Sequence, residues 1–390
     1  MWVDLNEVKL NNGNITTHLL ILRFVSNNLQ TELILVLSTK SNYMQPFSTF
    51  LIISIALFIN FTCVKAIANE TNSLPTVNVG VLKYGTVNWE MAVIKHHQLD
   101  KKHKFNLKIT PLSTKNASAV ALQSNAVDII LSDWLWVNRQ RFNNKNFTLF
   151  PTTIAAGGLY IPGDSKVKSL LDLNQVKIGI AGGAVDKNWL LLQAYAQQKY
   201  QLNINEKAEI VFASPPLLNR FMQKGDLDAS INFWHYSARL QADGFKLLVS
   251  VSQMLTKLGV DNNLPLLGWV FDQTWATNNN QAITGFIQAS IEAKKILLSS
   301  NEEWERIRPL TKAENDQVFS ALKNGYRNII LRKFGQEEIQ ASQKVFTILA
   351  KQGGQTLVGK ATELDNATFW HQSNVNLSLP ENINILDNDR

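Results

Sequence analysis

The chain is poor in cysteine, since Cys63 is the only one among its 390 residues. Disulfide frameworks, thiolate metal sites and cysteine nucleophiles all depend on this residue type. Cys63 lies in a stretch that we expect to be removed as a leader, and the residues before it do not fit a lipoprotein signal. We therefore expect no cysteine chemistry in the mature protein, whose rigidity must come from a large core.

The sequence also lacks the motifs of common enzyme classes. It has no G-x-S-x-G elbow, no Walker loop and no full G-x-G-x-x-G, and Gly179–Gly182 only weakly resembles a dinucleotide loop. His235 has no evident partner, and His96, His97 and His103 fall on a polar helix and loop without zinc-site spacing. We therefore expect no catalytic residues, no cofactor and no metal.

Clusters of charge of one sign are missing as well. Lysine and arginine outnumber aspartate and glutamate by 38 to 31, a net charge of +7, but they are scattered along the chain. This distribution argues against a nucleic-acid partner and mildly favours an anionic one. With 45% apolar and 18% charged residues the chain is globular, and its length predicts two domains.

An apolar run from Phe50 to Phe61 predicts a signal peptide. The run is shorter than the about 20 residues that a membrane-spanning helix needs. Ala66-Ile67-Ala68 supplies a small-x-small cleavage pattern, so we expect a signal peptide over residues 44–68, cleavage near Ala68 and a periplasmic mature protein. The alternative is an anchor that stays attached.

The residues before Met44 are unusual for a secretory leader. We expect Met44 or a nearby position to be the true start, with Met1 as the alternative. Residues 1–43 would then be upstream sequence without a fold.

From residue 77 onward, strand-like and helix-like runs alternate in two similar halves. The first half has expected strands at Val77–Tyr84, Phe105–Leu112, Val127–Leu131 and Thr148–Ile154. After a turn at Ile161–Asp164, the second half has expected strands at Val176–Ile180, Glu209–Ala213, Asp228–Phe233 and Phe245–Val251. This alternation predicts an α/β protein with two lobes, each a mostly parallel sheet covered by helices.

The pattern changes after Pro265–Phe271, the last expected strand. Helical periodicity follows over Ala282–Leu298, Glu302–Ile307, Ala313–Tyr326 and Glu337–Gln352. Gly353-Gly354 is expected to end the last helix. We expect residues 353–390 to form a loosely packed C-terminal tail.

The candidate site is predicted from the residues that follow the strands. Ligands of open α/β sheets bind at the carboxyl ends of the strands. The residues at or near these ends form the candidate ligand-binding set: Tyr84, Gly85, Thr86, Trp89, Ser132, Asp133, Trp134, Gly182, Gly183, Asp186, Lys187, Trp189, Asn232, Trp234 and Trp269.

The stretch Val176–Tyr200 is the centre of this set. A strand, a glycine turn and a helix start leave several backbone N–H groups in one small space, and Asp186 fits there as a cap. Lys187 opposes the helix dipole, so it is either solvated or faces something anionic. The alternative for the whole stretch is an ordinary βα unit.

Tryptophan recurs at these strand ends, where an indole can wall a cleft and still donate a hydrogen bond. The alternative for Trp89, Trp189 and Trp234 is that each cements a helix to a sheet. We interpret at least two of the tryptophans as cleft residues.

Four segments in order carry a resemblance to a known family: VDIILSDWLWVNRQR (127–141), KIGIAGGAVDKNWLLLQAYA (177–196), FASPPLLNRFMQKGDLDASINFWHYSARL (212–240) and LLGWVFDQTWA (266–276). Together they resemble the substrate-binding components of ABC transporters of the nitrate/sulfonate/taurine type (SsuA/TauA-like), related to the NMT1/THI5-like proteins. The resemblance covers about 77–352.

This resemblance implies a type II periplasmic-binding fold, with lobe one at 75–160 plus 260–350 and lobe two at 161–255. It implies ligand contacts from Tyr84 to Trp89, Ser132 to Trp134 and Gly182 to Lys187. Sulfonate binders often have small hydroxyl residues at the start of this lobe-two helix, so Asp186 argues against a simple inorganic anion.

The implied function is capture of a small organic solute, anionic or aromatic, by a monomer that delivers it to an ABC permease in the inner membrane. The alternatives are a THI5-like pyrimidine-precursor enzyme and a ligand sensor for a membrane receptor. The sequence does not name the ligand.

Overall fold

The computed structural model describes residues 2–12, 15–26, 29–39, 74–260, 264–371 and 377–380. The chain divides into two units, Met1–Ser73 and Leu74–Arg390. The expected signal peptide, its cleavage site near Ala68, Cys63 and the start at Met44 lie outside the described residues. No described helix is long and apolar enough to cross a membrane.

The first unit contains three strands, β1 (Trp2–Asn12), β2 (Ile15–Ser26) and β3 (Leu29–Thr39), in one antiparallel sheet of order β1-β2-β3. Trp2 pairs with Val25, and Ser26 pairs with Leu29. This differs from the expectation that residues 1–43 have no fold. The leucine- and β-branched-rich runs of β2 and β3 favour extended pairing.

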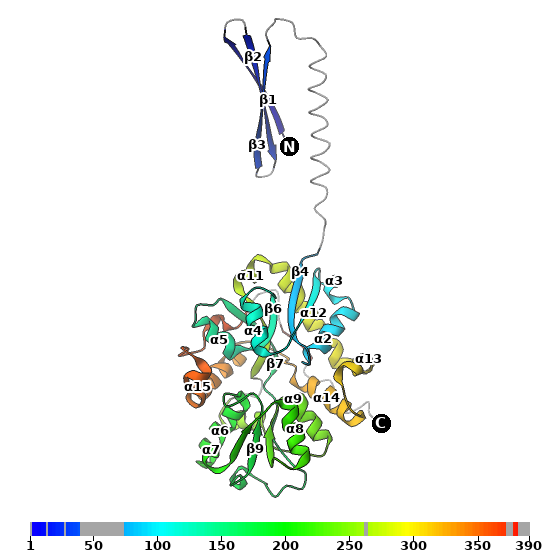
Figure 1. Cartoon of the computed structure of the whole chain (residues 1–390), viewed down its shortest axis with the longest axis vertical. Coiled ribbons are helices and arrows are strands. Elements are labelled where there is room, and N and C mark those ends of the chain that lie inside the picture. Colours follow the sequence, from blue (N-terminus) through cyan, green and yellow to red (C-terminus); the bar gives the residue numbers. More distant parts are fainter. Residues whose placement is uncertain are drawn as a thin grey trace. The chain divides into compact units, whose positions relative to one another are not determined.

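The second unit has two five-stranded sheets whose strand orders follow the same pattern. Figure 1 shows them in two lobes of this unit. The first has the order β5-β4-β6-β13-β7, formed by Asn106–Leu112, Thr76–Leu82, Ile129–Asp133, Pro265–Asp272 and Phe147–Ile154. The second has the order β10-β9-β11-β8-β12, formed by Glu209–Phe212, Lys177–Ile180, Ala229–Ile231, Gly158–Ile161 and Lys246–Ser250.

In each sheet the fourth strand runs against the others. β13 pairs antiparallel with β6 and β7, and β8 pairs antiparallel with β11 and β12. The chain enters the second sheet directly after β7, through β8, and returns to the first through β13. β8 is a four-residue strand next to the expected turn at Ile161–Asp164, and it was not among the strands expected from the sequence.

Helices surround both sheets. Those between the strands of lobe one are α2 (Val87–His96), α3 (Leu99–Lys102), α4 (Lys115–Gln123) and α5 (Trp134–Arg141). Those of lobe two are η1 (Leu170–Asp172), α6 (Lys187–Tyr200), α7 (Ile204–Lys207), α8 (Pro215–Lys224), α9 (Trp234–Ala242) and α10 (Val251–Lys257). The C-terminal part adds α11 (Gln273–Asn278), α12 (Asn280–Ser299), α13 (Asn301–Thr311), α14 (Asp316–Ile329), α15 (Gln336–Val358) and η2 (Asn366–Thr368).

The C-terminal helices link the lobes. Figure 1 shows α14 beside α9, and the two helices are in extensive contact. Arg239 of α9 reaches Glu314 with Nε at 3.2 Å from Oε1, and it donates to the carbonyl of Thr311 at 3.0 Å. α15 packs on α6 of lobe two and on α5 of lobe one. Lobe two is therefore held against α14 and α15 of the C-terminal region.

The C-terminal segment is packed more closely than the expected loose tail. α15 continues past a kink at Gly354 to Val358. Phe369 and Trp370 are buried, and the backbone N–H of Trp370 donates to the carbonyl of Leu149 in β7 at 2.9 Å. These apolar side chains gain contacts on the first sheet, which polar composition alone did not reveal.

Candidate functional site

A cavity of about 250 Å³ lies between the two lobes. It collects residues that follow strands of both sheets, together with residues of the C-terminal helices. The lining residues are Gly80, Val81, Leu82, Gly85, Thr86, Val87, Glu90, Lys115, Ser118, Ile130, Leu131, Ser132, Asp133, Thr152, Thr153, Ile154, Ala156, Asp186, Lys187, Asn188, Phe233, Trp234, His235, Leu266, Leu267, Lys294, Tyr326 and Ile329. Most of this wall is apolar.

The structure brings about half of the predicted site residues to this cavity. Those that line it are Gly85, Thr86, Ser132, Asp133, Asp186, Lys187 and Trp234. They come from the β4–α2, β6–α5, β9–α6 and β11–α9 connections. Each connection leaves the carboxyl end of a parallel strand, where the sheet opens between its covering helices.

The remaining predicted residues lie elsewhere. They are Tyr84, Trp89, Trp134, Gly182, Gly183, Trp189, Asn232 and Trp269, none of which is in the cavity lining. Tyr84 is 70% exposed, with Lys312 Nζ 4.7 Å from its ring centroid. Asn232 is buried and donates to the carbonyl of Pro215 and to the side chain of Asn219.

Four of these tryptophans are core residues. Trp89, Trp134, Trp189 and Trp269 are each at most 4% exposed. The indole N–H of Trp89 donates to Leu310 O at 3.2 Å, that of Trp134 to Pro265 O at 2.8 Å, and that of Trp269 to Ser290 Oγ at 2.8 Å. The donors of these three indoles are therefore satisfied inside the protein, as those of buried indoles usually are.

Asp186 caps α6. Its Oδ1 accepts from the N–H groups of Asn188 at 3.0 Å and Trp189 at 3.1 Å. Gly182 makes the approach possible, because its φ is +84° and an added Cβ would lie 3.0 Å from Asp186 Oδ2. The helix N-terminus is thus occupied by the chain's own carboxylate, and these N–H groups are not free to hold a bound anion.

Of the two alternatives for Lys187, solvation and an anionic neighbour, the structure supports the second, and the anion is Asp133. Lys187 Nζ lies 3.0 Å from Asp133 Oδ2 across the lobes. Burial alone would lower the pKa of Lys187 and raise that of Asp133, but their mutual attraction outweighs it in both. The pKa of Lys187 is therefore raised, that of Asp133 is lowered, and both are charged at neutral pH.

Lys115 brings a further cation to the cavity. It is the first residue of α4, and its Nζ lies 4.8 Å from the Phe233 ring centroid. Desolvation lowers the pKa of Lys115, while Asp133 opposes this effect. Among the described residues, no carboxylate makes an ion-pair contact with Lys115. An anion bound in the cavity would gain an ammonium that is not already committed.

A buried polar network forms one side of the cavity. Lys294 of α12 and Glu90 of α2 make an ion pair, and both are 2% exposed. Ser290 Oγ donates to Glu90, and Tyr326 Oη lies 3.4 Å from Glu90 Oε2. Burial raises the pKa of Tyr326 well above its ordinary value, with the Glu90 charge adding to it. The Glu90–Lys294 ion pair joins α2 to α12 beside the cavity.

His235 adds a neutral imidazole to the cavity wall. Burial, followed by the charge of Arg239, lowers its pKa from 6.5 to about 4. Between these values the unfolded chain binds a proton at His235 that the folded protein does not, so this group makes stability fall as the pH falls.

We expect His235→Gln to remove this pH dependence. The difference in unfolding free energy between wild type and variant should change by up to about 1.4 kcal/mol per pH unit between about pH 6.5 and 4, and stay constant above about pH 7.5. Urea unfolding over this pH range measures it. A difference that stays constant across the whole range would contradict a depressed pKa.

Sequence reasoning missed several lining residues for two different reasons. Lys115 could have been found, because it comes soon after the expected strand Phe105–Leu112, a strand end of lobe one from which no candidate was taken. Glu90 and Lys294 are 204 residues apart. They read as ordinary charged positions on two helices, and only packing brings them together.

No protein-family model matches the sequence, and no curated protein matches it. Solved structures do match. The alkanesulfonate-binding protein SsuA of Xanthomonas axonopodis pv. citri, bound to MOPS, has a TM-score of 0.58 at 14% identity and covers 76% of this chain and 99% of its own. The periplasmic aliphatic sulphonate binding protein SsuA of Escherichia coli has a TM-score of 0.57 at 17% identity, covering 73% and 99%.

An enzyme is also among the similar structures. The desulfurization enzyme DSZB has a TM-score of 0.51 at 11% identity and covers 72% of this chain and 92% of its own. At these identities the likeness extends to the fold. The second unit therefore has the type II periplasmic-binding fold, as the sequence resemblance implied.

Proposed function

We propose that the protein is a periplasmic solute-binding protein of the nitrate/sulfonate/taurine type. It holds a small organic anion between its lobes and delivers it to an ABC permease. The observation that carries the proposal is the cavity at the carboxyl ends of both sheets, with walls from each lobe. A ligand in this position contacts both lobes, so binding favours the closed arrangement.

The cavity's size and lining support an amphipathic ligand. Its about 250 Å³ is below the roughly 300–1,000 Å³ of drug-sized sites, which favours a compact molecule. Apolar residues such as Val81, Ile130 and Leu266 would hold a hydrocarbon or aromatic body, while Lys115 pairs with a sulfonate or carboxylate head. The similar structure bound to MOPS holds a sulfonate of this general kind.

The proposal is tested by titrating the purified protein with short alkane and aryl sulfonates, the matching carboxylates and the matching uncharged alcohols. Tryptophan fluorescence and calorimetry are the readouts. We expect the anions to bind and the alcohols to bind far more weakly. If no member of the panel alters fluorescence, heat or melting temperature, the proposal fails.

Lys115→Met should weaken binding of the preferred anion by about 10–100-fold, because it removes a charge-assisted hydrogen bond worth roughly 1.5–3 kcal/mol. The matched control is Lys166→Met, which removes an exposed lysine outside the cavity lining. Its affinity should equal that of the wild type. If Lys115→Met binds the anion as tightly as Lys166→Met does, Lys115 does not contact the ligand.

Two alternatives remain as outcomes of this test. A THI5-like pyrimidine-precursor enzyme would turn over its ligand. The cavity offers little support for this alternative, because among the described residues the ring of His235 makes no hydrogen bond that would orient it as a general base. A sensor would bind the same anion and then associate with a membrane receptor. Turnover by the purified protein would favour the first, and receptor capture without permease binding the second.

A further inference from the structure

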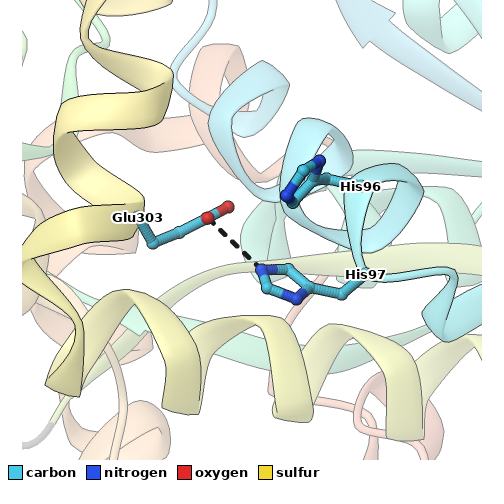
Figure 2. Close-up of side chains that lie close together, drawn as sticks. All are labelled: His96, His97 and Glu303. Atoms are coloured by element: carbon cyan, nitrogen blue, oxygen red, sulfur yellow. Dashed lines mark ion pairs between the residues drawn. The ribbon is translucent and has the colours of Figure 1, made fainter.

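A cluster of three metal-ligating side chains lies in lobe one, away from the cavity. His96 is the last residue of α2 and His97 follows it, while Glu303 lies in the first turn of α13. The two helices pack together, and Figure 2 shows the three side chains converging between them. One ligand atom from each lies within 4.8 Å of the other two. The sequence by itself shows only the adjacent histidines.

The distances approach those of a tetrahedral zinc site. His97 Nε2 and Glu303 Oε2 are 3.3 Å apart. Zinc bonds of about 2.0–2.1 Å at tetrahedral angles place two ligand atoms about 3.3 Å apart. The His97 and Glu303 atoms therefore already have the separation of two ligands in a tetrahedral zinc site. His96 is exposed, and a rotation of its side chain would bring its ring nitrogen to the same ion.

The carboxylate is held in place for such a role. Glu303 is 6% exposed, and Arg306 binds both of its oxygens, with Nε 2.9 Å from Oε2. A carboxylate has about four lone-pair positions, so Oε2 can accept from Arg306 and also bind a metal. Hydrogen-bonded carboxylates of this kind are the usual partners in metal sites. The C-terminal end of α2 carries partial negative charge, which favours a cation beside His96 and His97.

We propose that His96, His97 and Glu303 bind one Zn²⁺ ion, with water in the fourth position. Two imidazoles and one carboxylate suit zinc better than calcium or magnesium, which prefer oxygen ligands alone. The bound ion cross-links the end of α2 to the start of α13 and stabilises lobe one. This site is separate from the solute cavity, and it stands whether or not the protein binds an organic anion.

The test uses the full chain without a histidine tag, stripped with a chelator and titrated with ZnCl₂ by calorimetry. Titration with CoCl₂ gives a second readout, since tetrahedral Co²⁺ has a strong visible absorption band. We expect one ion per chain and a melting temperature that rises with Zn²⁺ concentration. His96→Gln and His97→Gln should each weaken Zn²⁺ binding by about tenfold or more and abolish the Co²⁺ band.

The matched control is His103→Gln. His103 Nε2 lies 2.8 Å from Glu292 Oε2, and Lys102 binds the other oxygen at 2.6 Å. His103, Glu292 and Lys102 thus form the same combination of histidine, carboxylate and cation as the proposed site, but without a second histidine. Its variant should bind Zn²⁺ as the wild type does. If either His96→Gln or His97→Gln keeps wild-type affinity, or if His103→Gln loses the same affinity, the three-residue site is overturned.

Discussion

Lys294→Met is expected to lower the free energy of unfolding by about 3–5 kcal/mol. The change removes the ammonium but leaves Glu90 buried at 2% exposure, with only hydroxyl groups to stabilise it. An uncompensated buried charge is among the most costly single changes in a protein. Urea unfolding of the purified variant, followed by circular dichroism, measures the loss.

The double variant Glu90→Gln with Lys294→Met separates the charge from the packing. Both charges are then absent, and the amide of glutamine keeps hydrogen bonds to Ser290 and Tyr326. We expect the double variant to recover most of the lost stability, because replacing both members of a buried pair is often nearly neutral. If the double variant is as unstable as Lys294→Met, the cost lies in lost lysine packing instead of the unpaired carboxylate.

Trp189→Ala is expected to cost about 3–5 kcal/mol of stability with little effect on ligand affinity. Trp189 is 2% exposed inside the core of lobe two and is not part of the cavity lining. The sequence alone favoured the opposite result, since this residue follows the glycine turn of the expected site. Unfolding experiments and anion titration of the same variant provide the two measurements.

Trp234→Ala is the matched comparison, because this tryptophan does line the cavity. Its ring meets Trp89 and Tyr326 at centroid distances of 6.1 and 6.3 Å, so it also joins α9 to lobe one. We expect a larger loss of affinity than in Trp189→Ala and a smaller loss of stability. If Trp189→Ala loses more affinity and Trp234→Ala loses more stability, Trp189 is the ligand contact and Trp234 the core residue.

Much of the second unit could be predicted because its signals are local. The expected strand at Val176–Ile180 overlaps β9 (Lys177–Ile180), and Asp186 caps the following helix as its position suggested. Hydrophobic periodicity and helix capping depend on residues close together in the chain, so both can be identified from the sequence. β8 was missed because four residues next to a Pro/Gly turn carry too little periodicity.

The amino-acid sequence by itself determined the α/β architecture, the two lobes and the loops that face the cavity. Only the tertiary structure decided which side chains point into it. The residues after a strand alternate between the core and the opening, so Asp133 faces Lys187 while its neighbour Trp134 is buried against Pro265. Likewise, Glu90 meets Lys294, and Glu303 meets His97, only because distant helices pack together. Pairs of residues some two hundred positions apart form only when the chain has folded, and no local pattern in the sequence predicts them.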